Sequence, residues 1–155
     1  MKKIILILMF IFSSMLVFAK GEEVLGKWIT EKADNGNQII VEIYQDTEGK
    51  YNGRIDALTM PVYTEGEFAG KEKMDLNNPD ENLKSRTLRG IDFVSGFNYS
   101  EENKKYENGK IYNPENGKLY NSYMKLQDDG KLLVKGSIDK KGLIGKKQIW
   151  TRYEK

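Results

Sequence analysis

The sequence has no cysteine and no histidine, and only three of its 155 residues are proline. The absence of cysteine excludes disulfides, thiol nucleophiles and thiolate metal sites. The absence of histidine excludes a Ser-His-Asp triad, an imidazole base and the usual zinc, copper and haem ligands. We therefore expect no cofactor and no metal site. The fold has to be stabilised by burial and backbone pairing alone.

Long apolar runs are also missing, except at the start of the chain. Two lysines precede a mostly apolar stretch over 4–19, which ends in Ala19 and gives way to polar residues. A basic start, an apolar centre and a small final residue are typical of a secretory signal peptide. An uncleaved anchor is the alternative, but the stretch is shorter than the roughly 20 residues that cross a bilayer core. We expect residues 1–19 to be a signal peptide and residues 20–155 to form one exported domain, periplasmic or extracellular.

An excess of one charge sign is missing as well. Without residues 1–19, basic and acidic side chains are equal in number, and they are interleaved along the chain. Nucleic-acid binders and membrane-surface proteins carry a one-sided cationic surface. We therefore expect no nucleic-acid partner and no stable membrane insertion after the signal peptide is removed. No pattern in the sequence indicates an oligomeric state.

The rest of the sequence consists of short runs of alternating polarity, each followed by a turn signal within about a dozen residues. This rhythm predicts an all-β fold of about eight antiparallel strands. The predicted strands are 24–30, 38–45, 51–58, 91–99, 110–113, 118–127, 131–138 and 146–153. Asn-Gly or Asp-Gly pairs at 108–109, 116–117 and 129–130 predict tight hairpins between the later strands.

An antiparallel sheet of this size has two exposed edges unless its first and last strands pair, so closure into an up-and-down β-barrel is favoured. Such a barrel encloses side chains or one small ligand. The alternation fails over 59–88, where proline, glycine and an Asp-Leu-Asn-Asn-Pro-Asp run predict a long loop with a helical turn at 81–85. Long ordered loops are usually functional. We expect this loop to act as a lid over one mouth of the barrel.

Two short motifs lie at the ends of the predicted domain. A Gly-Lys-Trp motif at 26–28 falls in the first predicted strand, and Trp-Thr-Arg at 150–152 falls in the last. In a closed barrel these strands are neighbours, so that the guanidinium of the last motif stacks on the indole of the first. This arrangement resembles the lipocalin and calycin signature and implies a lipocalin-like barrel. The residues expected to close the barrel, without contacting ligand, are Gly26, Trp28, Trp150 and Arg152.

Further motifs follow in order along nearly the whole of the exported part. They are G-x-W at 26–28, G-R-I at 53–55, D-x-x-N-P-D at 75–80, R-x-L-x-G at 86–90, N-P-E-N-G-K at 113–118, L-x-V-x-G at 132–136 and G-x-x-Q-x-W-T-R at 145–152. Together they resemble the bacterial family filed as domain of unknown function 2147. The resemblance implies a small exported β protein of uncharacterised activity, and it names no function.

Polar residues of the long loop form the candidate ligand site. If the loop folds over a barrel mouth, Arg86 presents its guanidinium to an anionic group on a ligand. The alternative is local, with Asp75 and Asn78 capping a turn and Arg86 reaching back to carboxylates. Calcium is disfavoured because the run lacks the glycine and terminal glutamate of an EF-hand loop. Tyr112 belongs to a series of tyrosines that is suited to stacking on a sugar or fatty chain, although packing on the pleated surface of the strands is favoured. The candidate ligand residues are Asp75, Asn78, Arg86 and Tyr112.

Three hypotheses follow. The first is an exported barrel that binds a small apolar or amphipathic molecule. The second is a cell-envelope module that contacts a protein or cell-wall polymer through exposed tyrosines such as Tyr99, Tyr106 and Tyr112. The third is a hydrolase with two facing carboxylates. Its candidate acids are Asp56, Asp75, Asp80 and Asp92. Because no nucleophile with an adjacent base is evident, we assign no catalytic residue.

Overall fold

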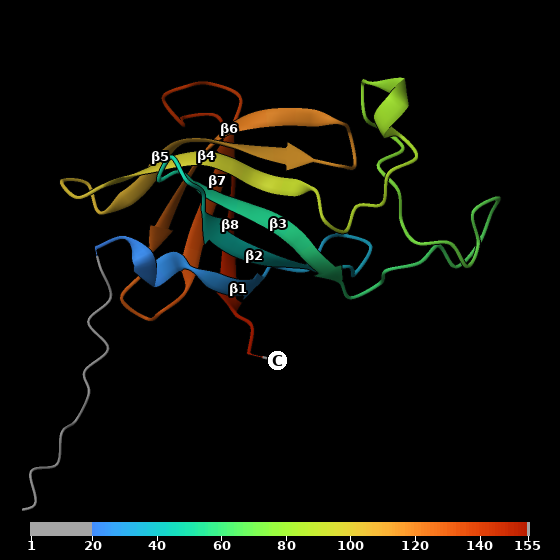
Figure 1. The fold of residues 1–155 in the computed structure, drawn as a ribbon, viewed down its shortest axis with the longest axis horizontal. Helices are drawn as coiled ribbons and strands as arrows, with labels where there is room; N and C mark the ends of the chain where they lie inside the picture. The colour runs from blue at the N-terminus through green and yellow to red at the C-terminus, as the bar shows by residue number, and fades with distance from the viewer. Residues whose placement is uncertain (1–19, 155) are drawn as a thin grey trace, which may run out of the picture.

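The structure, a computed structural model, describes residues 20–154 and shows an eight-stranded antiparallel barrel (Figure 1). The predicted signal peptide over 1–19 lies outside the described residues. The strands are β1 (Gly26–Ile29), β2 (Ile39–Gln45), β3 (Tyr51–Leu58), β4 (Asp92–Ser100), β5 (Lys105–Asn113), β6 (Lys118–Leu126), β7 (Leu132–Ser137) and β8 (Gly145–Arg152). Each strand pairs with the next, and β8 pairs with β1. The predicted up-and-down barrel is therefore confirmed.

Helical structure is limited to two short 3-10 turns. The first, η1 (Glu22–Val24), stands where the first strand was expected to begin, and η2 (Glu81–Leu83) is the helical turn expected in the long loop. The Asp80 carboxylate accepts from the backbone N–H of Asn82 and caps η2. Residues 20–154 contain no helix long and apolar enough to cross a membrane.

Every strand contributes a large buried side chain to one core, because alternate residues of a strand point to the same face. One from each strand is Trp28, Val41, Ile55, Phe97, Tyr106, Met124, Leu132 and Trp150. Two glycines show how tightly these side chains pack. A Cβ on Gly53 would lie 2.7 Å from Val94, and a Cβ on Gly109 would lie 2.4 Å from the Phe97 ring. The barrel interior is thus close-packed with side chains.

One of the predicted hairpins is wrong. Asn108 and Gly109 lie inside β5, and the turn between β4 and β5 falls instead at 101–104. Asn108 does have the positive φ, 61°, that Asn-Gly pairs favour, but it lies in a bulge, where the pairing of β5 with β6 shifts register. Gly109 is needed there because the Phe97 ring occupies the space of a side chain.

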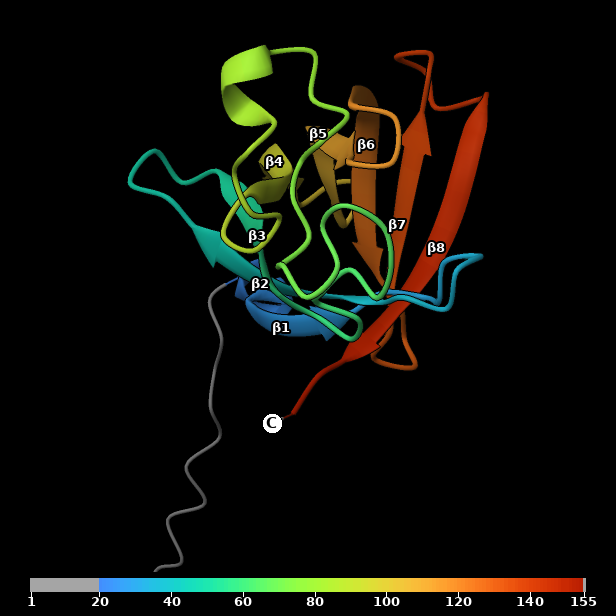
Figure 2. The same ribbon diagram turned by 90° about the vertical axis from the view of Figure 1, so that its right-hand side faces the viewer.

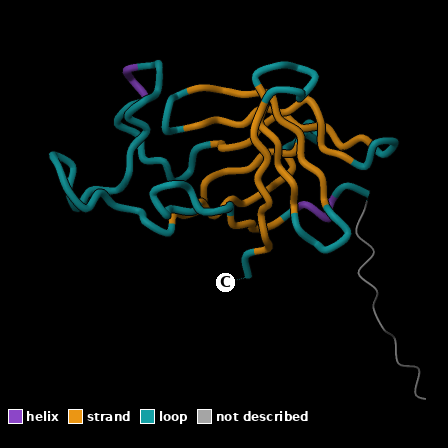
Figure 3. Tube along the Cα trace, turned by 180° about the vertical axis from the view of Figure 1, so that it is seen from behind, coloured by secondary structure: helices purple, strands orange, loops and turns teal. Residues whose placement is uncertain are grey.

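The connections lie alternately at two ends of the barrel, as the up-and-down topology requires. The closed end carries residues 20–25 and the turns at 46–50, 101–104 and 127–131. The loop end carries the connections 30–38, 59–91, 114–117 and 138–144. Figure 2 shows the 59–91 loop, hereafter the long loop, lying across the loop end. From behind, in Figure 3, it has no helix other than η2.

Candidate functional site

The closed end is built around the stack of Arg152 on Trp28. The two residues are partners in the pairing of β1 with β8, and the guanidinium carbon lies 4.1 Å from the centre of the buried indole. Gly26 has φ 105°, and a Cβ there would lie 3.2 Å from Arg152 Nη1. Glycine is favoured on both grounds. The structure therefore brings together three of the four residues expected to close the barrel.

Residues 20–25 are fixed across this end by side chains from three strands. Trp28 Nε1 donates to the Val24 carbonyl at 2.8 Å, and Arg152 Nη1 donates to the Leu25 carbonyl at 2.6 Å. The Tyr106 hydroxyl donates to the Gly21 carbonyl at 2.6 Å. Burial raises the pKa of Tyr106 far above its usual value. Trp150, the fourth residue, lies in the core, where its ring stacks on Phe93 at 5.9 Å.

The prediction that Tyr99, Tyr106 and Tyr112 are exposed, made for the envelope module, is wrong. Tyr106 and Tyr112 are buried, and Tyr99 is half-buried with its ring 5.0 Å from that of Tyr106. Tyr99 and Tyr106 are cross-strand partners, so their rings lie on the same, inward face of the barrel. Tyr112 is buried where the long loop covers β5, and its hydroxyl donates to Asp75. The packing role that strand tyrosines favour fits these positions, but sequence reasoning missed the hydrogen bond of Tyr106 in the closed end.

The four predicted ligand residues lie together where the long loop meets β5. Asp75 is fully buried, and its Oδ1 accepts from the Tyr112 hydroxyl at 2.5 Å. Its Oδ2 accepts from Arg86 Nε at 3.0 Å and Nη2 at 2.9 Å. Asn78 Nδ2 donates to the same oxygen at 2.8 Å. We call Asp75, Asn78, Arg86 and Tyr112 the loop anchor.

The loop anchor satisfies its own polar groups. Burial and the hydrogen bond to the Asp75 carboxylate raise the pKa of Tyr112 to about 12. Arg86, whose side chain is 39% exposed, directs its guanidinium to Asp75. This geometry matches the local alternative, in which Arg86 reaches back to a carboxylate. A ligand-binding role for the four residues stays a prediction.

A second contact holds the long loop against the turn between β5 and β6. Asn77 Nδ2 donates to the carbonyls of Pro114 and Glu115 at 3.1 and 3.0 Å. Gly117 has φ 68°, and a Cβ on it would lie only 1.9 Å from the Asn77 carbonyl oxygen. The D-x-x-N-P-D and N-P-E-N-G-K motifs are therefore two sides of one contact.

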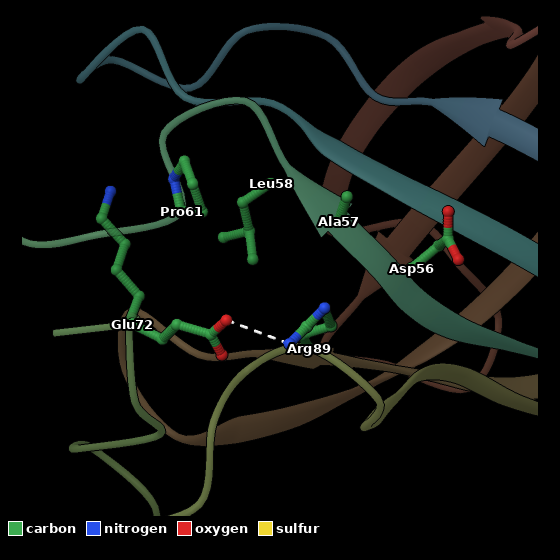
Figure 4. Close-up of a pocket in the computed structure, with 7 residues that line it drawn as sticks. Asp56, Ala57, Leu58, Pro61, Glu72 and Arg89 are labelled. Carbon is green, nitrogen blue, oxygen red and sulfur yellow. Dashed lines mark hydrogen bonds and ion pairs between the residues drawn. The ribbon is translucent and has the colours of Figure 1, made fainter. Parts of the chain in front are cut away.

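A hollow of about 280 Å³ opens between the end of β3 and the long loop (Figure 4). Its walls are Asp56, Ala57, Leu58, Pro61, Glu72, Lys73 and Arg89. Leu58 belongs to the core, and the Glu72 carboxylate accepts from Arg89 Nη2 at 3.0 Å on the opposite side. The hollow thus combines an apolar wall with a charged rim. Another hollow, of about 630 Å³, runs along 22–27 and the end of β8, outside the Trp28 stack.

None of the loop-anchor residues lines the hollow at β3, and sequence reasoning missed it. Its walls come from three stretches, 56–61, 72–73 and 89, that only the folded loop brings together. Within the loop, the antiparallel bridges of Val62 with Glu72 and of Met74 with Thr87 set this arrangement. The sequence offers no spacing from which it follows.

The acids proposed for a hydrolase do not gather in one cleft. Of the four, only Asp56 lines the hollow, and it accepts from Lys27 Nζ at 2.8 Å. Asp92 accepts from the Tyr44 hydroxyl at 3.0 Å, on the outside of the barrel. Among residues 20–154, no group of three or more acidic side chains is placed to hold a metal ion.

A closed, eight-stranded, up-and-down antiparallel barrel defines a lipocalin-like fold. The chain belongs to the family of uncharacterised proteins conserved in bacteria, DUF2147, whose model matches residues 26–152. It is similar to a solved structure described as protein HP1028 from the human pathogen Helicobacter pylori, of the lipocalin family. That likeness has 26% identity and a TM-score of 0.68, over 84% of this chain and 82% of the other. No curated protein matches the sequence. Both predicted resemblances are confirmed.

Proposed function

We propose that the protein binds a small amphipathic molecule in the hollow between β3 and the long loop. The filled interior of the barrel counts against a ligand held inside it, as the sequence suggested. The observation that carries the proposal is the hollow that remains open at the loop end of this lipocalin-like barrel. Its volume of about 280 Å³ is near the lower limit of ligand sites. The ligand is therefore small, and it binds beside the barrel core.

The chemistry of the walls indicates an anionic head and an apolar body. Leu58, Pro61 and Ala57 offer apolar surface, whereas Arg89 and Lys73 stand at the rim. Arg89 is held by Glu72 in an exposed ion pair, which contributes little to stability and is readily exchanged. A carboxylate or phosphate on a ligand can replace Glu72 on the guanidinium, with two parallel hydrogen bonds.

Export is part of the proposal. The basic and apolar pattern of residues 1–19 supports it. The absence of cysteine is compatible with export, because the domain needs no disulfide to fold. We place the protein in the periplasm or outside the cell, where a small barrel carries a molecule of the envelope or the medium.

The test is binding of 1-anilinonaphthalene-8-sulfonate, an amphipathic anion whose fluorescence rises in apolar sites. We expect saturable binding, weakened about tenfold or more in Arg89→Gln, because a charge-assisted hydrogen bond is lost. Arg54→Gln is the matched control. Arg54 lies over the Tyr44 ring on the barrel's outside and pairs with Glu42, away from the hollow. Absence of binding, or equal affinity of the two variants, contradicts the site.

A further inference from the structure

The most exposed large apolar side chains lie in the connections of the loop end or just after one of them. Among residues 20–154, the large apolar residues with the most exposure are Met60, Val62, Leu119, Ile138, Leu143 and Ile144. The first two lie in the long loop, Leu119 follows the turn at 114–117, and the last three belong to the connection of β7 to β8. Single exposed apolar residues are ordinary, but three within one short connection indicate a contact surface.

The connection from β7 to β8, which we call the apolar tip (residues 138–144), carries three of these side chains and stands apart from the long loop in Figures 1 and 2. Ile138, Leu143 and Ile144 are 73%, 77% and 65% exposed. The tip projects beyond the neighbouring strands in Figure 2. Ile138 N–H donates to the Ile144 carbonyl at 2.9 Å, so the two isoleucines face each other across the connection. These three side chains therefore contribute little to packing within residues 20–154.

The apolar tip is held in shape by Asp139. Its carboxylate accepts from the backbone N–H groups of Leu143 at 3.0 Å and Ile144 at 2.8 Å. These hydrogen bonds lower the pKa of Asp139 below its usual value, so the carboxylate is ionised at neutral pH. The tip therefore presents its leucine and isoleucine on a fixed turn, which limits the entropy lost when they are buried.

Lysines surround these apolar side chains. Lys140 and Lys141 lie within the tip and Lys146 and Lys147 follow at the start of β8; all four are exposed. None of them forms an ion pair with another residue of 20–154. Asp139 is the single acid in 138–147. Because charges are interleaved along the chain as a whole, the sequence predicted no cationic surface. That prediction overlooked the local excess of lysine over 138–147.

We propose that the apolar tip docks the loop end of the barrel onto an anionic phospholipid surface. Charge complementarity selects the occupant, because the exposed lysines are attracted to an anionic surface. Each lysine near such a surface strengthens binding roughly fivefold. Leu143 and Ile144 enter the headgroup region, and the lysines stay at the phosphates, as in other interfacial segments. The proposal does not depend on what the hollow binds.

Co-sedimentation with vesicles tests it. One set of vesicles is phosphatidylcholine alone, and the other is phosphatidylcholine and phosphatidylglycerol in equal parts. We expect binding to the anionic set only, reduced by salt as surface charges are screened. Lys140→Gln with Lys141→Gln is expected to weaken binding roughly thirtyfold. Leu143→Ser with Ile144→Ser is expected to weaken it on the order of a hundredfold.

The matched control is Lys125→Gln with Lys131→Gln, which removes two exposed lysines at the closed end. It is expected to keep binding within about twofold of the parent. Equal binding by the control and both tip variants overturns the proposal, as does the absence of binding to anionic vesicles. Dimerisation that Leu143→Ser with Ile144→Ser abolishes, without vesicle binding, also overturns it, in favour of an interface between two copies. Circular dichroism of each variant establishes that it is folded.

Discussion

The two ends of the barrel are fixed by different forces. At the closed end, aromatic rings from several strands pack together, and their polar atoms donate to the backbone of residues 20–25. At the loop end, the long loop is held mainly by hydrogen bonds around one carboxylate and by the Asn77 contact. The closed end is therefore stabilised mainly by burial of aromatic side chains. At the loop end, polar contacts hold the largely exposed long loop in place.

This difference shows where a binding function is compatible with the fold. Among the buried aromatic residues of the closed end there is no space for a ligand without loss of packing, and the hollow of about 630 Å³ at this end lies outside the Trp28 stack. At the loop end, the long loop buries two apolar side chains, Leu88 and Ile91, so local opening there costs less than global unfolding. The hollow beside Leu58 and the apolar tip both lie at this end. We infer that the closed end mainly stabilises the fold and that the loop end is the one suited to binding.

The largest expected effect is that of Trp28→Ala at the closed end. It leaves a cavity under Arg152, removes the hydrogen bond to Val24 and is expected to cost about 3–5 kcal/mol of unfolding free energy. Urea denaturation followed by far-ultraviolet circular dichroism measures the cost. Leu119→Ala, at an exposed position, is the control and is expected to change the free energy by less than about 0.5 kcal/mol. Similar costs for the two variants contradict the account of the closed end.

A smaller and more local effect is expected for Asp75→Asn in the loop anchor. The amide keeps the shape of the side chain but withdraws the charge that holds Arg86, at a cost of about 2–3 kcal/mol. Because the long loop opens separately, amide hydrogen exchange should rise over 59–91 and stay unchanged over 20–25. Asp80→Asn, which alters only the cap of η2, is the matched control. Equal acceleration at both ends means that the ends are not independent.

The barrel was predictable because its signals are local. Alternation of polarity marks each strand, and an antiparallel set this large closes to avoid free edges. Trp28 and Arg152 stand near the two ends of the chain, so closure alone makes them neighbours. The Asn108-Gly109 pair was wrongly predicted to form a hairpin turn, because a positive φ at asparagine is compatible with both a hairpin turn and a bulge. Only the position of the Phe97 ring distinguishes the two.

The site was predictable only in part. Asp75, Asn78, Arg86 and Tyr112 do meet, since a buried carboxylate needs donors and the loop offered few other arrangements. The hollow followed from no motif, because its walls join the end of a strand to two distant parts of the loop. Tertiary contacts in a segment without periodicity leave no trace in sequence spacing.

The smallest expected effect compares one tyrosine hydroxyl from each end as pH rises. Tyr112→Phe removes the hydroxyl that donates to Asp75, and Tyr106→Phe removes the one that donates to Gly21. Each loss is expected to cost about 1 kcal/mol near neutral pH. The pKa of Tyr112 is raised from 10.0 to about 12, so the folded state favours its protonated form. Its contribution is fully present below pH 10 and is lost as pH rises through about 12.

The difference in unfolding free energy between the parent and Tyr112→Phe should therefore shrink between pH 10 and about 12. Burial raises the pKa of Tyr106 still further, so the difference between the parent and Tyr106→Phe should persist to higher pH than that for Tyr112. Denaturant unfolding of the three proteins at a series of alkaline pH values measures both differences. If the free-energy differences for Tyr112→Phe and Tyr106→Phe disappear over the same pH range, the two hydroxyls are equally buried. That result contradicts the distinction drawn between the closed end and the loop end.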